Sequence, residues 1–590
     1  MLPKGFLKRC VVFGGLVLAL CGPAFRAAAG PAAVGSTPVS VADPGVPRPP
    51  GTPCTVPLFS DLTFTDFNTR PYSYAPPLGC GRRWSKVVLE ADFSVTAGRQ
   101  FDRTATLWLD GVNLYFGTTQ EPSAAVSPSW HVERDLTDYS ALLQQAGSGQ
   151  AIIGNIVNGT YTGVIHGSAR LLFYPVSARA PAARTPAMVV PLGSDPVGNT
   201  TELDDANSQL SRTLSLPRNI ERAYLDVFVQ SQNADEFWYT CVPDQYAARV
   251  QECGGGNFRE AEVSIDGQPA GVAPVYPWIY TGGIDPFLWR PTPGVQTLNF
   301  MPYRVDLTPF AGALSDGALH QIALSVAGAN HYFSATASLL LYLDPHARQV
   351  TGRIERNTLA GQPPIPTISD TLVTDQAGNI SGDITTQLRR RFVIEGVATT
   401  SRGRVRTAVE QTVGFHDVQG FTINATTYRQ VTDQQTSVDS VSRRTAGRRV
   451  IGEYRERLRY PLHLDINQQL ASDGSFTLAT QVRQGYEKRS AHQLFGVTLY
   501  EAGVSNTVNS ADTLDFDASG NFVGHTGQRS AQRFAFHDSL GGCYRADVAS
   551  LNGAVSTQSS GVGCPDQQNR VWWFSHPDGS PEDGNGVIGW

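Results

Sequence analysis

The chain has 590 residues, a formal net charge of −6 and 17% charged residues. This balance gives no reason to expect nucleic acid as a partner, because proteins that bind nucleic acids carry basic patches. Glycine (58) and proline (38) are plentiful and methionine (3) is scarce, which favours many short strands joined by turns over helical bundles. A chain of this length is expected to form three or more domains.

The first 29 residues have the pattern of a secretory signal. Lys4, Lys8 and Arg9 form a positive region, residues 10–20 form an apolar run too short to span a bilayer, and residues 27–29 are small. No later stretch is apolar enough for a transmembrane helix. We therefore expect a signal peptide at residues 1–29 and an exported protein, secreted or periplasmic, without a membrane attachment once the signal is removed.

Six cysteines lie outside the signal, and export makes disulfides plausible for them. Several connectivities are possible, so the pairing is predicted from proximity alone. A zinc site is the alternative, but the sequence has no Cys-x-x-Cys or His-Glu-x-x-His spacing, so we expect no metal. The predicted pairs are Cys54 with Cys80, Cys241 with Cys253, and Cys543 with Cys564.

An internal sequence repeat predicts two similar domains in tandem. Apolar residues alternate along residues 87–95 and again along 223–229, as in strands with one buried face. The segment at 131–139 resembles the one at 303–310, and each copy has an upstream strand that ends in Asp-Gly, a hairpin signal. We expect an all-β fold of two jelly-roll-like β-sandwiches.

The expected domain boundaries follow from changes in composition. Residues 349–575 are rich in Thr, Gln, Arg and Ser and still contain strand-like runs, so we predict a third β-rich region there. Proline-rich segments are expected to lack order or to link domains. The full division is a proline-rich leader at 30–50, a first sandwich at 51–178, a linker at 179–218, a second sandwich at 219–348, the C-terminal β-rich domain at 349–575 and a flexible tail at 576–590.

Residues 235–239, Asp-Glu-Phe-Trp-Tyr, place two carboxylates beside three aromatic rings. Aromatic faces stack on sugar rings and carboxylates perform acid–base work, so this stretch indicates a glycan-handling site. The alternative is that the rings point into a β-core and the acids lie at a solvated strand end. The sequence has neither a Gly-x-Ser-x-Gly nucleophile elbow nor a phosphate-binding loop, which leaves paired carboxylates as the best candidates for chemistry.

Several motifs resemble the peptide:N-glycanase A family, and more distantly peptide:N-glycanase F, which is built from two jelly-roll sandwiches. The most specific is Tyr-Thr-Gly-Gly-Ile-Asp-Pro-Phe-Leu-Trp-Arg-Pro at 280–291. The resemblance implies hydrolysis of the amide between N-acetylglucosamine and asparagine, with no cofactor and with N-glycosylated peptides or proteins as partners. The other matching segments are 98–103, 161–163, 235–239 and 258–260.

The resemblance also implies site residues. The catalytic aspartate of the distant relative lies in a Trp-Asp-Arg-Tyr segment, which Asp102 in Phe-Asp-Arg-Thr matches. Its glutamate lies in a disulfide-bounded loop; here Glu236 is chosen by context, with Glu260 in reserve and Asp235 adjacent. One acid from each sandwich would place the scissile bond at the domain interface. The implied substrate contacts are Arg103, Asn155, Tyr161, Trp238, Tyr239, Arg259, Trp289 and Arg290.

Two other function classes compete with the glycoamidase. A glycoside hydrolase also uses two carboxylates but cleaves a bond between sugars. A non-catalytic glycan-binding protein is the third possibility, since jelly rolls are common lectin scaffolds.

Overall fold

The computed structural model describes residues 35–582, and the predicted signal peptide at 1–29 lies outside them. The first part of the chain forms a β-sandwich whose two sheets bury Val87, Leu107 and Phe173 between them. One sheet has the order β1 (Thr37–Pro38), β7 (Pro128–Asp135), β4 (Trp84–Val95), β9 (Ile165–Pro175) and β2 (Cys54–Phe64); the other has β3 (Arg70–Tyr74), β8 (Gly147–Ile153), β5 (Thr104–Leu109) and β6 (Val112–Thr118).

A second sandwich follows. Its sheets have the orders β10-β18-β13-β16, with β11 also on β18, and β12-β17-β14-β15. The bounds are β10 (Met188–Pro191), β11 (Thr201–Leu203), β12 (Leu210–Ser215), β13 (Ile220–Ser231), β14 (Glu260–Ile265), β15 (Gln268–Pro274), β16 (Tyr303–Asp306), β17 (Leu319–Ala327) and β18 (Phe333–Leu343).

The internal repeat found in the sequence is confirmed as a repeat of structure. The alternating residues of 87–95 form the inner face of β4, and those of 223–229 lie in the core on β13. The repeated segment forms β7 in the first copy and β16 in the second, each paired with the long central strand of its sheet. Both Asp-Gly pairs form tight hairpins with positive φ, 46° and 84° at Asp110 and Gly111 and 50° and 76° at Asp266 and Gly267.

The expected linker at 179–218 is instead part of the second sandwich, because it supplies β10, β11 and β12. Leu192, Leu203 and Leu210 anchor this segment in the core. Strands at the margin of a sheet need few apolar residues, so their polar and glycine-rich composition resembled a linker.

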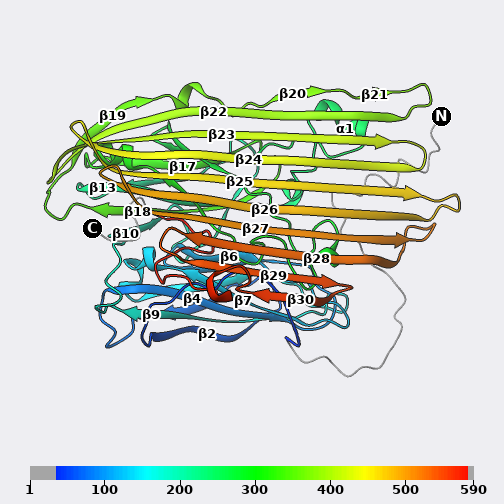
Figure 1. Ribbon diagram of the computed structural model, residues 1–590, viewed down its shortest axis with the longest axis horizontal. Helices are drawn as coiled ribbons and strands as arrows, with labels where there is room; N and C mark the ends of the chain where they lie inside the picture. The colour runs from blue at the N-terminus through cyan, green and yellow to red at the C-terminus, as the bar shows by residue number, and fades with distance from the viewer. Residues whose placement is uncertain (1–34, 583–590) are drawn as a thin grey trace.

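The third region is a twelve-stranded antiparallel sheet, here called the C-terminal sheet, whose long strands run across the molecule (Figure 1). Strands β22 to β28 have 17 to 22 residues each and alternate between buried and accessible side chains. The bounds are β19 (Thr351–Asn357), β20 (Thr367–Asp370), β21 (Val373–Thr374), β22 (Ile380–Thr400), β23 (Gly403–Ile423), β24 (Thr427–Ala446), β25 (Arg449–Leu470), β26 (Phe476–Leu494), β27 (Val497–Phe516), β28 (Phe522–Asp538), β29 (Cys543–Leu551) and β30 (Ala554–Ser560).

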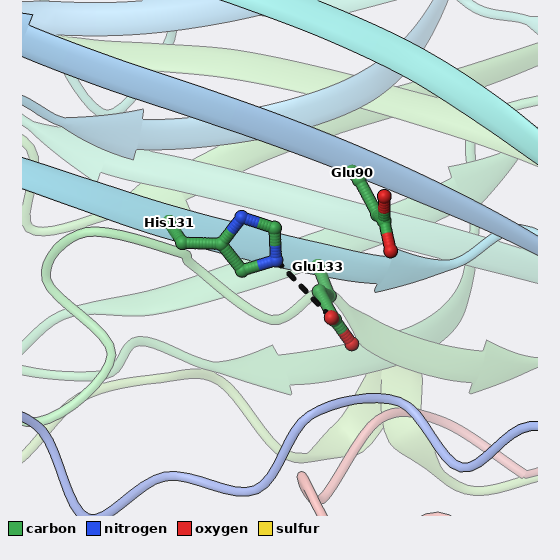
Figure 2. A group of neighbouring side chains, drawn as sticks. All are labelled: Glu90, His131 and Glu133. Carbon is green, nitrogen blue, oxygen red and sulfur yellow. Dashed lines mark hydrogen bonds and ion pairs between the residues drawn. The ribbon is translucent and has the colours of Figure 1, made fainter.

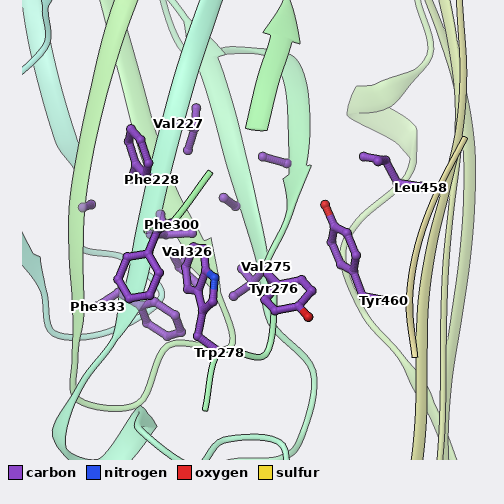
Figure 3. Close-up of a cluster of buried hydrophobic side chains, with 14 of the residues drawn as sticks. Val227, Phe228, Val275, Tyr276, Trp278, Phe300, Val326, Phe333, Leu458 and Tyr460 are labelled. Atoms are coloured by element: carbon purple, nitrogen blue, oxygen red, sulfur yellow. The ribbon is translucent and has the colours of Figure 1, made fainter. Parts of the chain in front are cut away.

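The inner face of the C-terminal sheet packs on the second sandwich and shares one hydrophobic cluster with it (Figure 3). Tyr460 of β25 meets Tyr276 edge to face, with ring centroids 4.9 Å apart, and Trp278 packs on Phe300 at 4.2 Å. The backbones come close as well: a Cβ on Gly396 would lie 1.8 Å from the carbonyl oxygen of Pro309. The second sandwich is therefore held between the first sandwich and the C-terminal sheet.

The proline-rich leader was expected to lack order, and for residues 35–50 that is wrong. Ala42 and Val46 are buried. The Asp43 carboxylate accepts hydrogen bonds from Asn506 Nδ2 at 2.7 Å and Gln532 Nε2 at 3.1 Å. Side chains of the C-terminal sheet thus order a segment that has no core of its own.

The expectation of a flexible tail at 576–590 is wrong for its described part, residues 576–582. Lys488 Nζ donates to the Ser580 carbonyl at 2.8 Å, and Glu582 lies 2.7 Å from His492 Nε2. The three disulfides predicted from proximity are present. Between residues 35 and 582, no helix has the length and apolar character needed to cross a membrane.

Candidate active site

Asp102 lies in the loop that leads into β5 and faces the second sandwich. Its Oδ2 accepts a hydrogen bond of 3.0 Å from the backbone N–H of Gly282. Glycine is needed here, because a Cβ would lie 2.3 Å from Glu121 Oε1 and 3.0 Å from Asp102 Oδ1. The segment 277–297, which connects β15 to β16 and is here called the crossing segment, therefore meets the carboxylate through its backbone.

Glu121 follows β6 and stands beside Asp102. Its Oε1 accepts from the Asp102 backbone N–H at 3.2 Å, and its Oε2 lies 3.7 Å from Arg290 Nη2. Glu121 was not predicted from the sequence. It occupies an ordinary Gln-Glu-Pro loop, so only the fold shows that it shares a site with Asp102.

Glu236 completes a group of three carboxyls that we call the interface cluster, defined as Asp102, Glu121 and Glu236. It follows η4 (Asn233–Asp235) at the end of β13, so it comes from the second sandwich. Burial, followed by the charges of Asp102 and Glu121, raises its pKa to about 8. Asp102 and Glu236 keep part of their surface accessible, while Glu121 is 8% exposed.

The interface cluster holds more acidic groups than it can ionise at neutral pH. Burial and the neighbouring Asp102 raise the pKa of Glu121 to about 8. Burial also raises the pKa of Asp102, against the Gly282 N–H and the charge of Arg103, which favour its ionised form. Glutamic acids that keep their protons at neutral pH thus stand beside an aspartate whose Oδ2 has a backbone donor, and acid–base catalysis uses such neighbouring groups as proton donor and base.

Aromatic and cationic side chains border the interface cluster on the side of the first sandwich. Phe101 and Tyr161 are partly exposed, with ring centroids 5.2 Å apart. Arg103 lies over Phe101 at 5.7 Å, and Arg99 lies over Tyr161 at 5.4 Å. This border offers apolar faces and hydrogen-bond donors to a sugar. Arg103 and Tyr161 lie in this border and Arg290 lies beside Glu121, while their role as substrate contacts stays a prediction.

Asp235 and Arg259 do not face the interface cluster but bind each other in the interior. Arg259 donates to Asp235 Oδ1 from Nε at 2.9 Å and from Nη2 at 2.6 Å, and the Asn330 N–H donates to Oδ2 at 2.7 Å. Both side chains are almost wholly buried. The expectation that they act in catalysis or substrate binding is wrong, because their polar atoms are already engaged; they fix the loop that carries Glu236.

The expected sugar platform at Trp238 is also wrong. Trp238, Tyr239 and Trp289 are each 0% exposed, so the alternative of a core position holds for Trp238 and Tyr239. Trp289 Nε1 donates to the Gly283 carbonyl at 2.9 Å, inside the crossing segment. Rings that are closed off by protein on both faces cannot stack on a sugar.

Asn155 and Glu260 serve the fold at other places. Asn155 is fully buried, and its amide donates to the carbonyls of Phe64 and Gly163. Glu260 begins β14 and binds Arg390 of the C-terminal sheet, while its neighbour Glu262 binds the same arginine at 2.6 Å. Burial and Glu262 raise the pKa of Glu260 to about 8, but this group belongs to the contact between the two sheets.

A second acidic group, which we call the sheet cluster, comprises Glu90, His131 and Glu133 on the outer face of the first sandwich (Figure 2). Their ligand atoms lie within 4.8 Å of one another, as in a metal site. However, Arg48 Nη2 already lies 2.6 Å from Glu90 and 2.7 Å from Glu133. The guanidinium of the leader supplies the positive charge that a metal would bring, so the residues do not point to a metal site.

An internal cavity of about 80 Å³ lies between the second sandwich and the C-terminal sheet. Tyr276, Trp278, Tyr460 and Lys488 are among its lining residues, and no member of the interface cluster lines it. It therefore belongs to the packing of the two sheets rather than to the chemistry.

Comparison with known proteins assigns the family. Residues 46–360, which include the whole interface cluster, match the family model described as peptide N-acetyl-β-D-glucosaminyl asparaginase amidase A. The chain belongs to this family. It is also 27% identical over 530 residues to the peptide-N4-(N-acetyl-β-glucosaminyl)asparagine amidase A of Prunus dulcis, an alignment that covers 85% of this chain and 90% of the relative.

Two solved structures share a weaker likeness. PNGase F, a glycosylasparaginase from Flavobacterium meningosepticum, aligns with 50% of this chain and 96% of its own at 14% identity and a TM-score of 0.33. PNGF-II aligns with 49% of this chain and 66% of its own at 12% identity and a TM-score of 0.35. The all-β assignment made above follows from the strands of this chain itself.

Proposed function

We propose that this protein is a glycoamidase that hydrolyses the amide between N-acetylglucosamine and asparagine in N-glycosylated peptides or proteins. The reaction releases the glycan as a glycosylamine and leaves aspartate. The observation that carries the proposal is that a member of the amidase A family has Asp102 and Glu121 of one sandwich in the same cluster as Glu236 of the other. An interface between domains is a usual place for a substrate cleft.

Amide hydrolysis explains why three carboxyls of unequal acidity would be placed together. Water attacks an amide slowly unless a base orients it and takes its proton, and unless donors stabilise the oxyanion that forms. Asp102 is the proposed base, because the Gly282 N–H and Arg103 favour its ionised form. Glu236, whose pKa is about 8, is protonated at neutral pH and is the proposed donor to the amide oxygen or the leaving nitrogen.

Glu121 is proposed to couple the other two groups. Once Glu121 ionises, near pH 8, its charge opposes the ionisation of Glu236, and Arg290 lies close to its carboxyl. The rim formed by Phe101, Tyr161 and Arg103 is the proposed contact for the sugar next to the scissile bond. Tyr161 and Arg103 are thus retained as substrate contacts, and Phe101 joins them.

We also propose that the protein acts outside the cytoplasm. Its three disulfides require an oxidising compartment, and N-glycoproteins are substrates expected there. Detection of the mature protein in the culture medium or periplasm, with its N-terminus near residue 30, would test this.

Product analysis tests the reaction. A synthetic N-glycopeptide is incubated with the protein in water enriched in heavy oxygen, and the peptide is then sequenced by mass spectrometry. The glycoamidase yields aspartate carrying one heavy oxygen at the former glycosylation site. A glycoside hydrolase would leave a sugar on asparagine, and a glycan-binding protein would leave the glycopeptide intact; either result would refute the proposal.

A further inference from the structure

The C-terminal sheet contributes no member of the interface cluster, yet it holds the loop that carries Glu236 and the crossing segment that contacts Asp102 and Glu121. We propose that this sheet is the scaffold of the active site: Asp512, with a set of buried glutamines, positions the crossing segment so that Gly282 reaches Asp102 and Arg290 reaches Glu121. Asp512 and its partner Asp285 are positioning residues in this proposal, which rests on the function proposed above.

The crossing segment is hydrogen-bonded to the first sandwich near the interface cluster. Thr281 Oγ1 donates to the Thr119 carbonyl at 2.8 Å, and Gln120 Nε2 donates to the Trp289 carbonyl at 2.7 Å. Thr119 and Gln120 immediately precede Glu121. Any displacement of the crossing segment would therefore act directly on the interface cluster.

Glutamines of the C-terminal sheet form hydrogen bonds with the other side of the crossing segment. Gln484 of β26, which is 0% exposed, donates to the Pro277 carbonyl at 2.7 Å and accepts from the Val295 N–H at 2.8 Å. Gln528 of β28 donates to the Arg290 carbonyl at 3.0 Å. A buried amide that pairs with a loop backbone fixes its position, because an unpaired partner would incur the full desolvation cost.

The loop that carries Glu236 is held in the same way. Gln419 of β23 donates to the Cys241 carbonyl at 3.0 Å, and Gln430 of β24 donates to the Thr240 carbonyl at 2.7 Å. Both amides are buried. The inner face of the C-terminal sheet thus provides hydrogen-bonding side chains at successive strands for both loops of the second sandwich that reach the site.

Asp285 and Asp512 form the most distinctive of these contacts. Asp285 caps the start of η5 (Pro286–Trp289), where its Oδ1 accepts from the Phe287 N–H at 2.8 Å, and its buried Oδ2 lies near Asp512 of β27, the strand that η5 contacts. His525 of β28 lies 3.1 Å from Asp512 Oδ2 and stacks on Phe287 at 3.8 Å.

The protonation of this pair follows from its surroundings. Burial and then the charge of Asp512 raise the pKa of Asp285 to about 8, while the nearby Arg290 opposes the shift. The pKa of Asp512 is also raised by burial, against the hydrogen bond and charge of His525. Protonation of Asp285, which is favoured below about pH 8, removes the like-charge repulsion between the two neighbouring carboxyls.

The test compares Asp512→Ala, Asp512→Asn and the control Asp473→Asn in the full chain, where Asp473 is an exposed turn residue of the same sheet. Steady-state kinetics on an N-glycopeptide and amide hydrogen exchange of residues 277–297 are measured for each. We expect Asp512→Ala to lower kcat by about tenfold or more with little change in KM, because small misplacements of reacting groups are costly. Exchange should accelerate in the crossing segment, and Asp512→Asn, which keeps a hydrogen-bonding side chain, should restore both measurements.

Two results would overturn the scaffold proposal. The first is wild-type kcat and wild-type exchange in Asp512→Ala. The second is faster exchange throughout the C-terminal sheet that Asp512→Asn fails to correct, since that marks a merely structural residue. Failure of the proposed function is recognised separately: the wild-type protein would leave the glycopeptide unchanged, while the exchange of residues 277–297 would still decide whether Asp512 positions them.

Discussion

Two acidic clusters, one on the outer face of the first sandwich and one at its interface with the second, differ in how their charges are balanced. In the sheet cluster, burial would raise the pKa of Glu133, but hydrogen bonds from His131 and Arg48 outweigh it and lower the pKa to about 2. In the interface cluster, burial and neighbouring carboxyls raise the pKa values of Glu121 and Glu236 to about 8. A cluster whose carboxylates are all paired with cations is structural. Carboxyls with too few neighbouring cations keep their protons, which are then available for chemistry.

The largest expected effect separates the two clusters directly. Asp102→Asn should lower kcat by roughly 10²–10⁴-fold, because the variant loses the general base but keeps a side chain of the same shape. The melting temperature should remain close to that of the wild type. Steady-state kinetics on an N-glycopeptide and thermal unfolding check the two parts. Turnover near the wild-type rate would remove Asp102 from the mechanism.

Loss of the disulfide beside Glu236 should lower both stability and activity, although it changes no residue of the interface cluster. Cys241 and Cys253 are 12 residues apart, and closing a short loop stabilises a protein by roughly 2–3 kcal/mol in the chain-entropy model. Replacing both by serine should lower the free energy of unfolding by about this amount and reduce kcat. Chemical denaturation and kinetics measure the two effects. The matched control replaces Cys543 and Cys564, whose loss should leave the kcat of the folded protein unchanged.

Glu133→Gln should lower stability and leave kcat unchanged, which is the opposite of the result expected for Asp102→Asn. The pKa of Glu133 in the folded protein is about 2, below its ordinary value of 4.5. Its contribution to stability is therefore present above about pH 4.5 and lost as the pH falls towards 2. We expect the variant to lose roughly 2 kcal/mol at pH 7 and nearly nothing at pH 2, with kcat unchanged. Unfolding curves at several pH values test this, and a change in kcat would break the distinction between the clusters.

The smallest effect concerns the pH profile. Glu121→Gln removes a carboxyl that, once ionised near pH 8, opposes the ionisation of Glu236. The pKa of Glu236 should fall, so its protonated form is lost at lower pH and the alkaline limb of the kcat profile should move to lower pH. The profile of Glu133→Gln should stay in place as a control. A shift of the Glu121→Gln profile to higher pH would contradict the proposed coupling.

The local pattern of the sequence was sufficient for the central strands of both sandwiches and for the disulfides, but not for β10, β11 and β12. Alternation over residues 87–95 gives one face of β4 its apolar character, and Asp-Gly permits the positive φ values of both hairpins. Such features depend on neighbours in the chain. Asp102 was chosen from the family resemblance rather than from the local pattern, and its catalytic role stays a prediction.

The tertiary structure decided which polar and aromatic residues reach the interface cluster. Asp235 and Glu236 are adjacent in sequence, yet Asp235 is committed to Arg259 and only Glu236 faces the carboxyls of the first sandwich. Glu121, the leader and the end of the described tail gave no local signal, because their partners lie far away in the chain. Burial and pKa depend on those distant partners, so the composition of the site became visible only when both sandwiches and the C-terminal sheet had been brought together.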